Sequence, residues 1–335
     1  MLQKGRQTWF FDPRPTIFAT GTVVGRTEGE GPLGADFDFI QKDNHAGKDS
    51  FEKAEQAMLE QACSFALTKS GIAPKDIDFF IAGDLLNQIT ASGYTARNFK
   101  APYLGIFAAC ATSMEGLALA SLLISSGMAK NVLTATSSHN CTAERQFRYP
   151  NEYGFQRPPS SQYTASAAGA AVILPQGGPV SIDSATIGKV VDLKNCDPVN
   201  MGKAMAPAAA DTILTHMQER GVSASDYDLI CTGDLGEIGR DIAWDLLSRE
   251  GFTYDKTRFV DCGMMLYQGN KKVFAGGSGC GCCASVGYGH IYKKIASSEL
   301  GKVLLVATGA LFSPISLQQC ESIATIAHAV ALERS

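Results

Sequence analysis

The sequence lacks the features that mark several large classes of protein. Its 29 lysines and arginines against 33 aspartates and glutamates leave a formal net charge of only −4. Nucleic acid and anionic membranes are therefore not expected as bulk partners. No apolar run approaches the roughly 20 residues of a membrane-spanning helix, and the longest candidate, residues 303–312, is interrupted by Thr308 and Gly309. Contact with a membrane is expected to be peripheral or to run through partner proteins.

A secretory signal, a disulfide framework and a metal motif are not evident either. Residues 1–9 hold no apolar stretch of signal-peptide length, and ten cysteines scattered through apolar segments are typical of reduced thiols in a cytoplasmic protein. Cys280, Cys282 and Cys283 have C-x-C-C spacing, unlike the paired C-x₂-C of zinc sites, so no metal is expected. The glycine-rich turn around them lacks the Lys-Ser/Thr of a phosphate-binding P-loop, which argues against a nucleotide.

What the sequence does contain is organised around one cysteine. An apolar run over residues 103–109 ends at Cys110, and residues 111–127 have the spacing of a largely buried helix. Small neighbours allow a strand to turn directly into that helix, which places Cys110 at its first free backbone N–H groups. The helix dipole favours an anion there, so the position suits a nucleophilic thiolate or an anion-binding pocket. A buried structural cysteine is the alternative interpretation.

The pattern of elements occurs twice. A predicted strand over residues 16–25 and a long surface loop over 26–48 precede a helix that begins at Asp49, with Glu52 as its capping-box partner. The helix ends at Gly71 and leads into a strand over residues 77–83. Strands that are apolar throughout and alternate with helices indicate sheets covered on both faces.

The second copy follows at an offset of 150 residues. Gly71 matches Gly221, and residues 83–85 (Gly-Asp-Leu) match residues 233–235. Further on, residues 132–136 match residues 304–308, and Cys110 matches Cys282 or Cys283. The sequence therefore predicts a duplicated α/β unit, with an N-terminal half over residues 1–180 and a C-terminal half over residues 181–335. Its best-formed pocket is expected where the two halves meet.

These features resemble the thiolase-like condensing-enzyme superfamily over the whole chain. The resemblance rests on the duplication, the Cys110 elbow, the Gly-Ala-Ala strand at residues 169–171 and the glycine-rich turn over residues 276–283. It implies a five-layer α-β-α-β-α fold and a homodimer. Ketoacyl synthases of this superfamily use a nucleophilic cysteine, matched by Cys110, with a His-Asn or His-His pair. The histidine would fall within residues 231–238 and the asparagine near Cys280, and neither stretch holds one. Because such donors stabilise the developing anion, the pocket is expected to persist without the parent chemistry.

Longer strings resemble one family of spore-forming bacteria, stage V sporulation protein AD. They are residues 82–88, 137–140, 144–150, 201–207, 232–236, 261–263, 276–279 and 307–311. The resemblance implies a soluble, non-enzymatic protein that binds dipicolinate, with or without calcium, for uptake into the developing spore and release in germination. It also implies membrane-embedded stage V sporulation A proteins as partners, and a peripheral location on the cytoplasmic side of the forespore or spore inner membrane.

Dipicolinate is a flat ring with two carboxylates, so its pocket needs hydrogen-bond donors and positive potential. A polar, proline-punctuated rim segment over residues 138–165 supplies candidates, although its arginines would otherwise be solvated or pair with Glu144 and Glu152. Asp84 and Asp234 end equivalent strands, where capping a loop is the alternative role. No catalytic residue, metal ligand or cofactor is expected. The predicted ligand-binding residues are Cys110, Asp84, His139, Asn140, Arg145, Arg157, Lys203 and Cys280.

Three hypotheses therefore remain at the level of the sequence. The first is a dipicolinate-binding protein with its ligand near Cys110. The second is a ketoacyl-synthase-like acyltransferase that keeps Cys110 as nucleophile and has replaced the partners with Asp84, Asp234 or His139. The third is a structural subunit that only docks onto membrane proteins and has no affinity for a small ligand.

Overall fold

The computed structural model describes residues 2–3, 5–147 and 158–335. Two groups of five strands form its framework. In the first group the order is β3 (Thr16–Val24), β9 (Ala167–Leu174), β7 (Val132–Ser138), β5 (Phe79–Asp84) and β6 (Tyr103–Gly105). In the second it is β10 (Val180–Ile187), β15 (Ala324–Arg334), β14 (Lys302–Leu311), β11 (Leu229–Gly233) and β12 (Phe259–Asp261).

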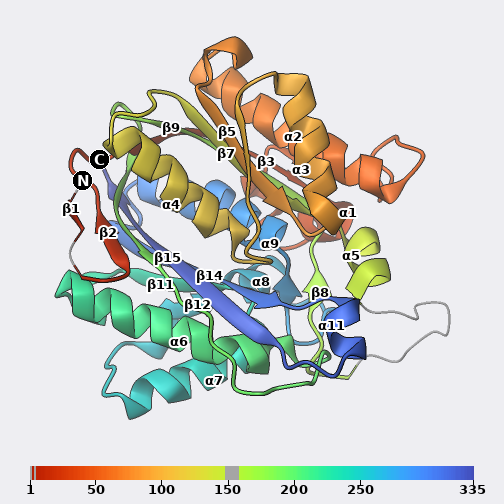
Figure 1. Cartoon of the computed structure of the whole chain (residues 1–335), viewed down its shortest axis with the longest axis vertical. Coiled ribbons are helices and arrows are strands. Elements are labelled where there is room, and N and C mark those ends of the chain that lie inside the picture. Colours follow the sequence, from red (N-terminus) through yellow and green to blue (C-terminus); the bar gives the residue numbers. More distant parts are fainter. Residues whose placement is uncertain (1, 4, 148–157) are drawn as a thin grey trace.

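The two groups have the same strand directions. In each, the last three strands are parallel and the second strand is antiparallel to both of its neighbours. The groups touch where β3 and β10 pair, over only two register positions, Val180 with Ile17 and Ser181 with Thr16. Beyond that point they diverge, and helices fill the space between them (Figure 1).

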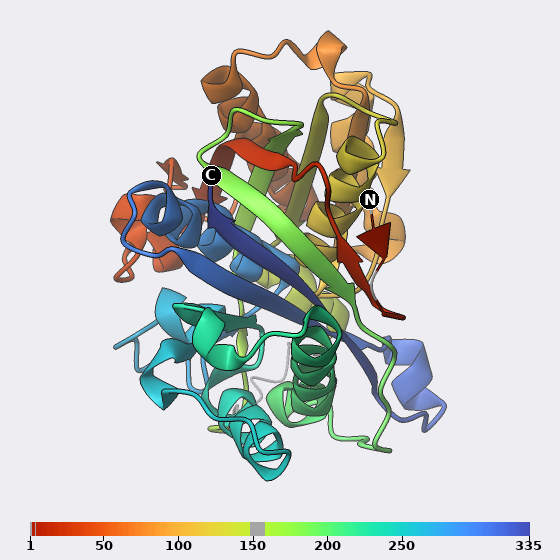
Figure 2. The same cartoon turned by 90° about the vertical axis from the view of Figure 1, so that its left-hand side faces the viewer.

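Helices make up the other three layers (Figures 1 and 2). One outer layer is α2 (Phe51–Ser70) and α3 (Thr90–Phe99), and the other is α6 (Met201–Arg220) and α7 (Gly236–Arg249). The central layer holds α4 (Thr112–Ser125) and α9 (Cys280–Ser285), which continues through a π-helical segment (Val286–Ile291) into α10 (Tyr292–Ala296). The predicted duplicated five-layer fold is confirmed.

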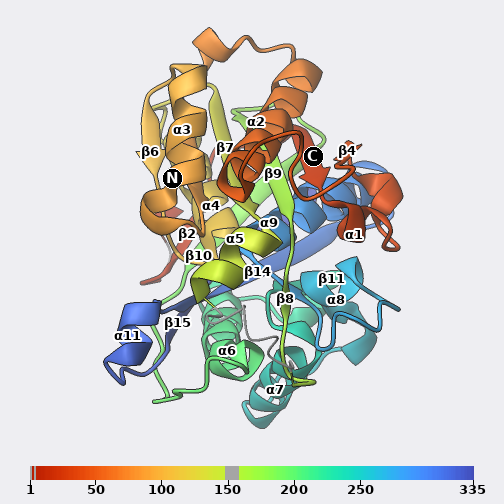
Figure 3. The ribbon, with the colours of Figure 1, turned by 90° about the vertical axis from the view of Figure 1, so that its right-hand side faces the viewer.

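Short elements connect this framework. They are α1 (Arg26–Gly29), α5 (Asn140–Phe147), α8 (Cys262–Leu266), α11 (Pro314–Gln318), β1 (Leu2–Gln3), β2 (Thr8–Phe10), β4 (Phe39–Ile40), β8 (Tyr163–Thr164) and β13 (Gly277–Ser278). The pair β8–β13 joins the rim segment to the second half. Figure 3 shows α5, β8 and α11 on the same side of the molecule.

The repeat is visible at the ends of the long helices. Helices α2 and α6 both have 20 residues at the predicted offset, and Gly71 and Gly221 end them with positive φ angles of 70° and 67°. One detail of the prediction is wrong: Ser50, and not Asp49, caps α2, because its hydroxyl accepts a hydrogen bond from Lys53 N at 3.3 Å. Asn200 caps α6 in the same way, from Lys203 N at 3.2 Å.

Candidate functional site

Cys110 lies in a tight turn directly before α4. Ala109 has a φ of 50°, which is unusual for a residue with a Cβ. The Thr112 hydroxyl donates to Ala109 O at 2.6 Å and accepts from Ala108 N at 3.0 Å, so the first turn of the helix fixes the turn that precedes it. Strand β14 also passes so close that a Cβ on Gly309 would lie 2.2 Å from Ala108 O. The predicted strand before Cys110 is shorter than expected, because β6 ends at Gly105.

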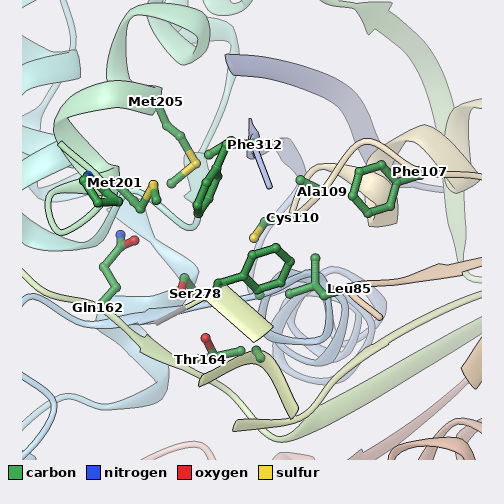
Figure 4. A pocket seen from close by; sticks show the side chains of 15 residues that line it. Leu85, Phe107, Ala109, Cys110, Gln162, Thr164, Met201, Met205, Ser278 and Phe312 are labelled. Carbon is green, nitrogen blue, oxygen red and sulfur yellow. The ribbon is translucent and has the colours of Figure 1, made fainter. Parts of the chain in front are cut away.

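A cavity of about 640 Å³, part of it open to solvent, lies against Cys110. In Figure 4 the sulfur of Cys110 lies amid the lining side chains, with Met201, Met205 and Phe312 to one side and Leu85 and Phe107 to the other. The described lining has no charged side chain. It consists of Leu85, Phe107, Ala109, Cys110, Ala143, Phe147, Gln162, Thr164, Pro198, Met201, Met205, Ser278, Gly279, Ala310 and Phe312.

Three helices begin at this cavity. Cys110 lies two residues before the start of α4, Met201 is the first residue of α6, and Ser278 and Gly279 are the two residues before α9. Each helix N-terminus carries a partial positive charge. Since the described lining contains no carboxylate, the cavity combines apolar walls with a potential that favours an anion.

The structure separates the two predicted cysteines. Cys110 is partly exposed and lines the cavity. Cys280 is fully buried behind Gly279, and its thiol donates to Ser137 O at 2.9 Å. Burial raises the pKa of Cys280 well above its usual range, so it is a neutral donor. Cys282 and Cys283 lie in the first turn of α9 and are fully buried.

Asp84 is a loop cap and does not line the cavity. Its carboxylate is fully buried and accepts from Leu86 N at 2.8 Å and from Ser92 N at 2.7 Å. In the second half the corresponding task belongs to Asp261, whose carboxylate accepts from four backbone N–H groups, those of Leu235, Gly236, Gly263 and Met264. The capping role considered for Asp234 is therefore filled by another residue. Asp234 is fully buried, and burial raises its pKa well above the usual range.

His139 and Asn140 brace the rim segment from behind. His139 is buried, with Nε2 at 2.8 Å from Asn44 O and Nδ1 accepting from Cys141 N at 3.2 Å. Burial lowers its pKa, so the ring is neutral. Asn140 Nδ2 donates to Thr164 O at 3.0 Å. Neither side chain lines the cavity. Asn140 does, however, hold the backbone of Thr164, and Thr164 lines the cavity.

The predicted cations are also placed away from the wall. Arg145 is exposed on α5 and pairs with Glu52 of α2. Lys203 is exposed because it lies two residues, about 200°, around α6 from Met201, which faces the cavity. Arg157 lies outside the described residues, as does Arg148. The structure thus brings Cys110 to the cavity and leaves Arg145 and Lys203 on the surface.

Most of the cavity wall was not found from the sequence. Met201 and Met205 line it from one face of α6, and Phe147 and Phe312 contribute rings whose centroids are 5.5 Å apart. The spacing of Met201 and Met205 by four residues was a usable signal, because it puts both side chains on one face at the start of a helix. For Phe147 and Phe312, one at the end of α5 and one after β14, no sequence pattern indicates a shared wall.

No metal site accompanies the cavity in the described part of the chain. Those residues contain no group of three or more His, Cys, Asp or Glu side chains arranged to hold an ion. In the same residues, every helix is too short or too polar to cross a bilayer.

Comparison with known proteins gives the family. The family model described as "Stage V sporulation protein AD" matches residues 5–333. A protein of the same name from Bacillus subtilis (strain 168) is 49% identical over 335 residues, which cover 100% of this chain and 99% of that protein. The chain belongs to the stage V sporulation protein AD family.

Solved structures of enzymes share the fold of this family member. A 3-oxoacyl-[acyl-carrier-protein] synthase III from Aquifex aeolicus VF5 matches with a TM-score of 0.61 at 15% identity, covering 95% of this chain and 99% of the synthase. Human mitochondrial 3-ketoacyl-CoA thiolase matches with a TM-score of 0.60 at 12% identity, covering 96% and 99%. At these identities the likeness establishes the thiolase-like fold and no activity.

Proposed function

We propose that this family member binds dipicolinate in the cavity beside Cys110 and catalyses no reaction on it. In this role it serves uptake of dipicolinate into the developing spore and its release in germination, beside membrane-embedded stage V sporulation A proteins at the inner membrane. The observation that carries the proposal is the meeting of three helix N-termini at an aromatic cavity whose described lining has no carboxylate.

The chemistry of the ligand suits this lining. The rings of Phe107, Phe147 and Phe312 offer apolar faces to a flat pyridine. The helix N-termini and the polar groups of Gln162, Thr164 and Ser278 offer donors to two carboxylates. Calcium, where it takes part, would enter with the ligand as its counter-ion.

Calorimetric titration with dipicolinate, with and without calcium, tests this proposal. Met205→Trp fills the cavity from α6 and should weaken binding by tenfold or more, about 1.4 kcal/mol. Lys203→Ala, on the exposed side of the same helix, is the matched variant and should bind like the wild type. A flat titration of the wild type in both conditions would remove the binding proposal, and a loss confined to Lys203→Ala would move the ligand to the surface.

Acyl transfer is the second candidate, because Cys110 lines a cavity in a fold shared with acyl-transferring enzymes. Mass spectrometry of the intact protein after incubation with acyl-CoA decides between the two. The non-enzymatic proposal predicts no acyl adduct on the wild type. An adduct that is present in the wild type and absent from Cys110→Ala would favour the transferase.

We also propose a homodimer formed along β6. This strand pairs only with β5 in the described part of the chain, so its outer edge is open. Around that edge Tyr94, Leu104 and Phe107 are 50%, 41% and 49% exposed, an unusual concentration of apolar side chains for a free surface. Sedimentation should show a dimer for the wild type and a monomer for Leu104→Lys. A monomeric wild type would contradict this.

A further inference from the structure

Glu55 is a fully buried carboxyl group in the middle of α2. Its Oε1 lies 3.2 Å from Ser137 Oγ at the end of β7, and its Oε2 lies 2.8 Å from Thr142 Oγ1 on α5. We propose that Glu55 is a neutral carboxylic acid that ties α5 to α2 and β7 and thereby positions one wall of the cavity. The expected effect of Glu55 on dipicolinate affinity rests on the proposed function, whereas the protonation of Glu55 does not depend on it.

A count of hydrogens favours a proton on Glu55. The Thr142 hydroxyl has one hydrogen and lies near two oxygens, Glu55 Oε2 at 2.8 Å and His139 O at 2.9 Å. The single hydrogen of Thr142 can make only one of these two bonds, and His139 O also accepts from Ala143 N at 3.0 Å. Both Thr142 contacts are hydrogen bonds at once only if Glu55 Oε2 carries a hydrogen and donates it to Thr142, which then donates to His139 O. Ser137 donates its own hydroxyl hydrogen to Oε1, which completes the set.

The charges around Glu55 agree with this assignment. Burial and the neighbouring Asp84 raise the pKa of Glu55 to about 8. Asp84 accepts two backbone N–H bonds and Glu55 accepts none that the structure records, so of the two acids Asp84 is the better holder of a negative charge. A second charge beside it in this buried region is unfavourable.

Among the residues that the structure describes, no cation pairs with Glu55 to offset that second charge. Cys280 of α9 faces Glu55 as a neutral thiol, and His139 at the start of α5 is neutral. Strands β3, β7 and β9, which pack beside α2, carry no titratable side chain. The remaining titratable groups on α3 and α5 are Tyr94, Arg97, Cys141, Glu144 and Arg145. Tyr94 and Arg97 form a surface stack, burial raises the pKa of the Cys141 thiol, and Arg145 pairs with Glu52.

Glu55 is connected to the cavity wall on two sides, through Thr142 and through Ser137. Thr142 directly precedes Ala143, which lines the cavity together with Phe147 at the end of the same helix. On the other side, Ser137 O accepts the Cys280 thiol, next to the lining residue Gly279. When Glu55 loses its proton, the single hydrogen of Thr142 can bond either Glu55 Oε2 or His139 O but not both, so α5 loses one of its two hydrogen bonds at Thr142 and gains a buried negative charge beside it.

Three measurements on Glu55→Gln test the proposal. Glutamine keeps the shape and both kinds of hydrogen-bonding group but cannot ionise. Glu60→Gln is the matched control, since Glu60 lies on the outer side of the same helix and accepts from Asn98. Infrared difference spectra at pH 7, taken as wild type minus Glu55→Gln and as Glu60→Gln minus Glu55→Gln, should both show a protonated-carboxyl band from Glu55, while the bands of other buried acids such as Asp234 cancel. The band should disappear as the pH rises past about 8.

The other two measurements are the amide hydrogen exchange of α5 and the affinity for dipicolinate. Amide hydrogen exchange of α5, corrected for intrinsic rates, should accelerate above pH 8 in the wild type and in Glu60→Gln but not in Glu55→Gln. Affinity for dipicolinate should fall over the same range, by up to about tenfold per pH unit for one coupled proton, and stay constant in Glu55→Gln.

Each outcome has a distinct meaning. Absence of the infrared band overturns the proton assignment. A band without the change in α5 exchange overturns the positioning role. If no variant binds dipicolinate at any pH, the proposed function fails, while the band and the exchange of α5 still decide the role of Glu55.

Discussion

The position of Cys110 depends on a glycine far away in the sequence. A Cβ on Gly309 would meet Ala108 O at 2.2 Å and Ala109 Cβ at 3.2 Å. The turn that carries Cys110 would have to shift to accommodate it, since backbone atoms cannot yield as a flexible side chain does. The cavity therefore requires a residue without a side chain on β14.

We predict that Gly309→Ala lowers the free energy of unfolding by about 1–3 kcal/mol and weakens dipicolinate binding. Gly93→Ala is the control, because a Cβ there meets nothing within 4 Å and the residue lies inside α3. It should leave binding unchanged and raise stability by about 0.5–1 kcal/mol. Urea denaturation measures the stability of the two variants, and calorimetric titration measures their affinity for dipicolinate. Equal stability of the two variants would contradict the close approach at Gly309.

A second prediction at this scale concerns His328 in β15. It is buried, its Nδ1 accepts from Gly188 N at 3.2 Å, and burial lowers its pKa to about 4. In the unfolded chain this histidine is protonated below its ordinary pKa of 6.5, whereas in the folded chain it stays neutral down to about pH 4. The free energy of unfolding therefore decreases as the pH falls from 6.5 to 4. The contribution is at most about 1.4 kcal/mol per pH unit.

His328→Asn keeps an acceptor for Gly188 N and does not titrate. The difference in unfolding free energy between the wild type and this variant should therefore shrink as the pH falls from 6.5 to 4 and stay constant above 6.5. Chemical denaturation across this range measures it. A difference that does not change with pH would show that His328 titrates as it does in the unfolded chain.

At the scale of elements, the long helices α2 and α6 have the same length and the same type of N-terminal cap. Ser50 and Asn200 accept from the backbone N–H three residues ahead in α2 and α6. We predict that Ser50→Ala and Asn200→Ala each cost about 0.5–2 kcal/mol of stability. Only Asn200→Ala should also weaken dipicolinate binding, because α6 begins at the cavity with Met201. Thermal unfolding and titration test this, and equal effects on binding would contradict it.

The elements were predictable because their patterns are local. Apolar strands, the glycines that end α2 and α6 and the repeat at 150 residues are all written in short stretches. The cap of α2 was misassigned by one residue, since Asp49 and Ser50 are both good N-cap residues and only the local geometry distinguishes them.

The cavity was less predictable because it is built from residues that no single stretch brings together. Cys110 was found because a strand-to-helix turn with small residues is a local signal. Arg145 and Lys203 were chosen for their charge, but the structure gives the cavity its positive potential from helix ends, which no side chain reveals. The buried acid Glu55 was missed because its burial depends on α5 and β7 packing over α2.

At the scale of the molecule, duplication explains where the cavity lies. The two halves put corresponding turns, before α4 and before α9, on either side of one space, and the start of α6 closes it. The family is established over nearly the whole chain, and the likeness to condensing enzymes establishes the fold. The binding function proposed above needs the cavity but no chemistry at Cys110.

The most direct test of this account is a crystal structure of the chain with dipicolinate. We predict electron density for the ligand in the cavity, in contact with Phe312 and near the turns at Cys110 and Ser278, and no covalent bond to the Cys110 sulfur. Density at the surface beside Arg145 or Lys203, or an empty cavity at saturating ligand, would contradict the account.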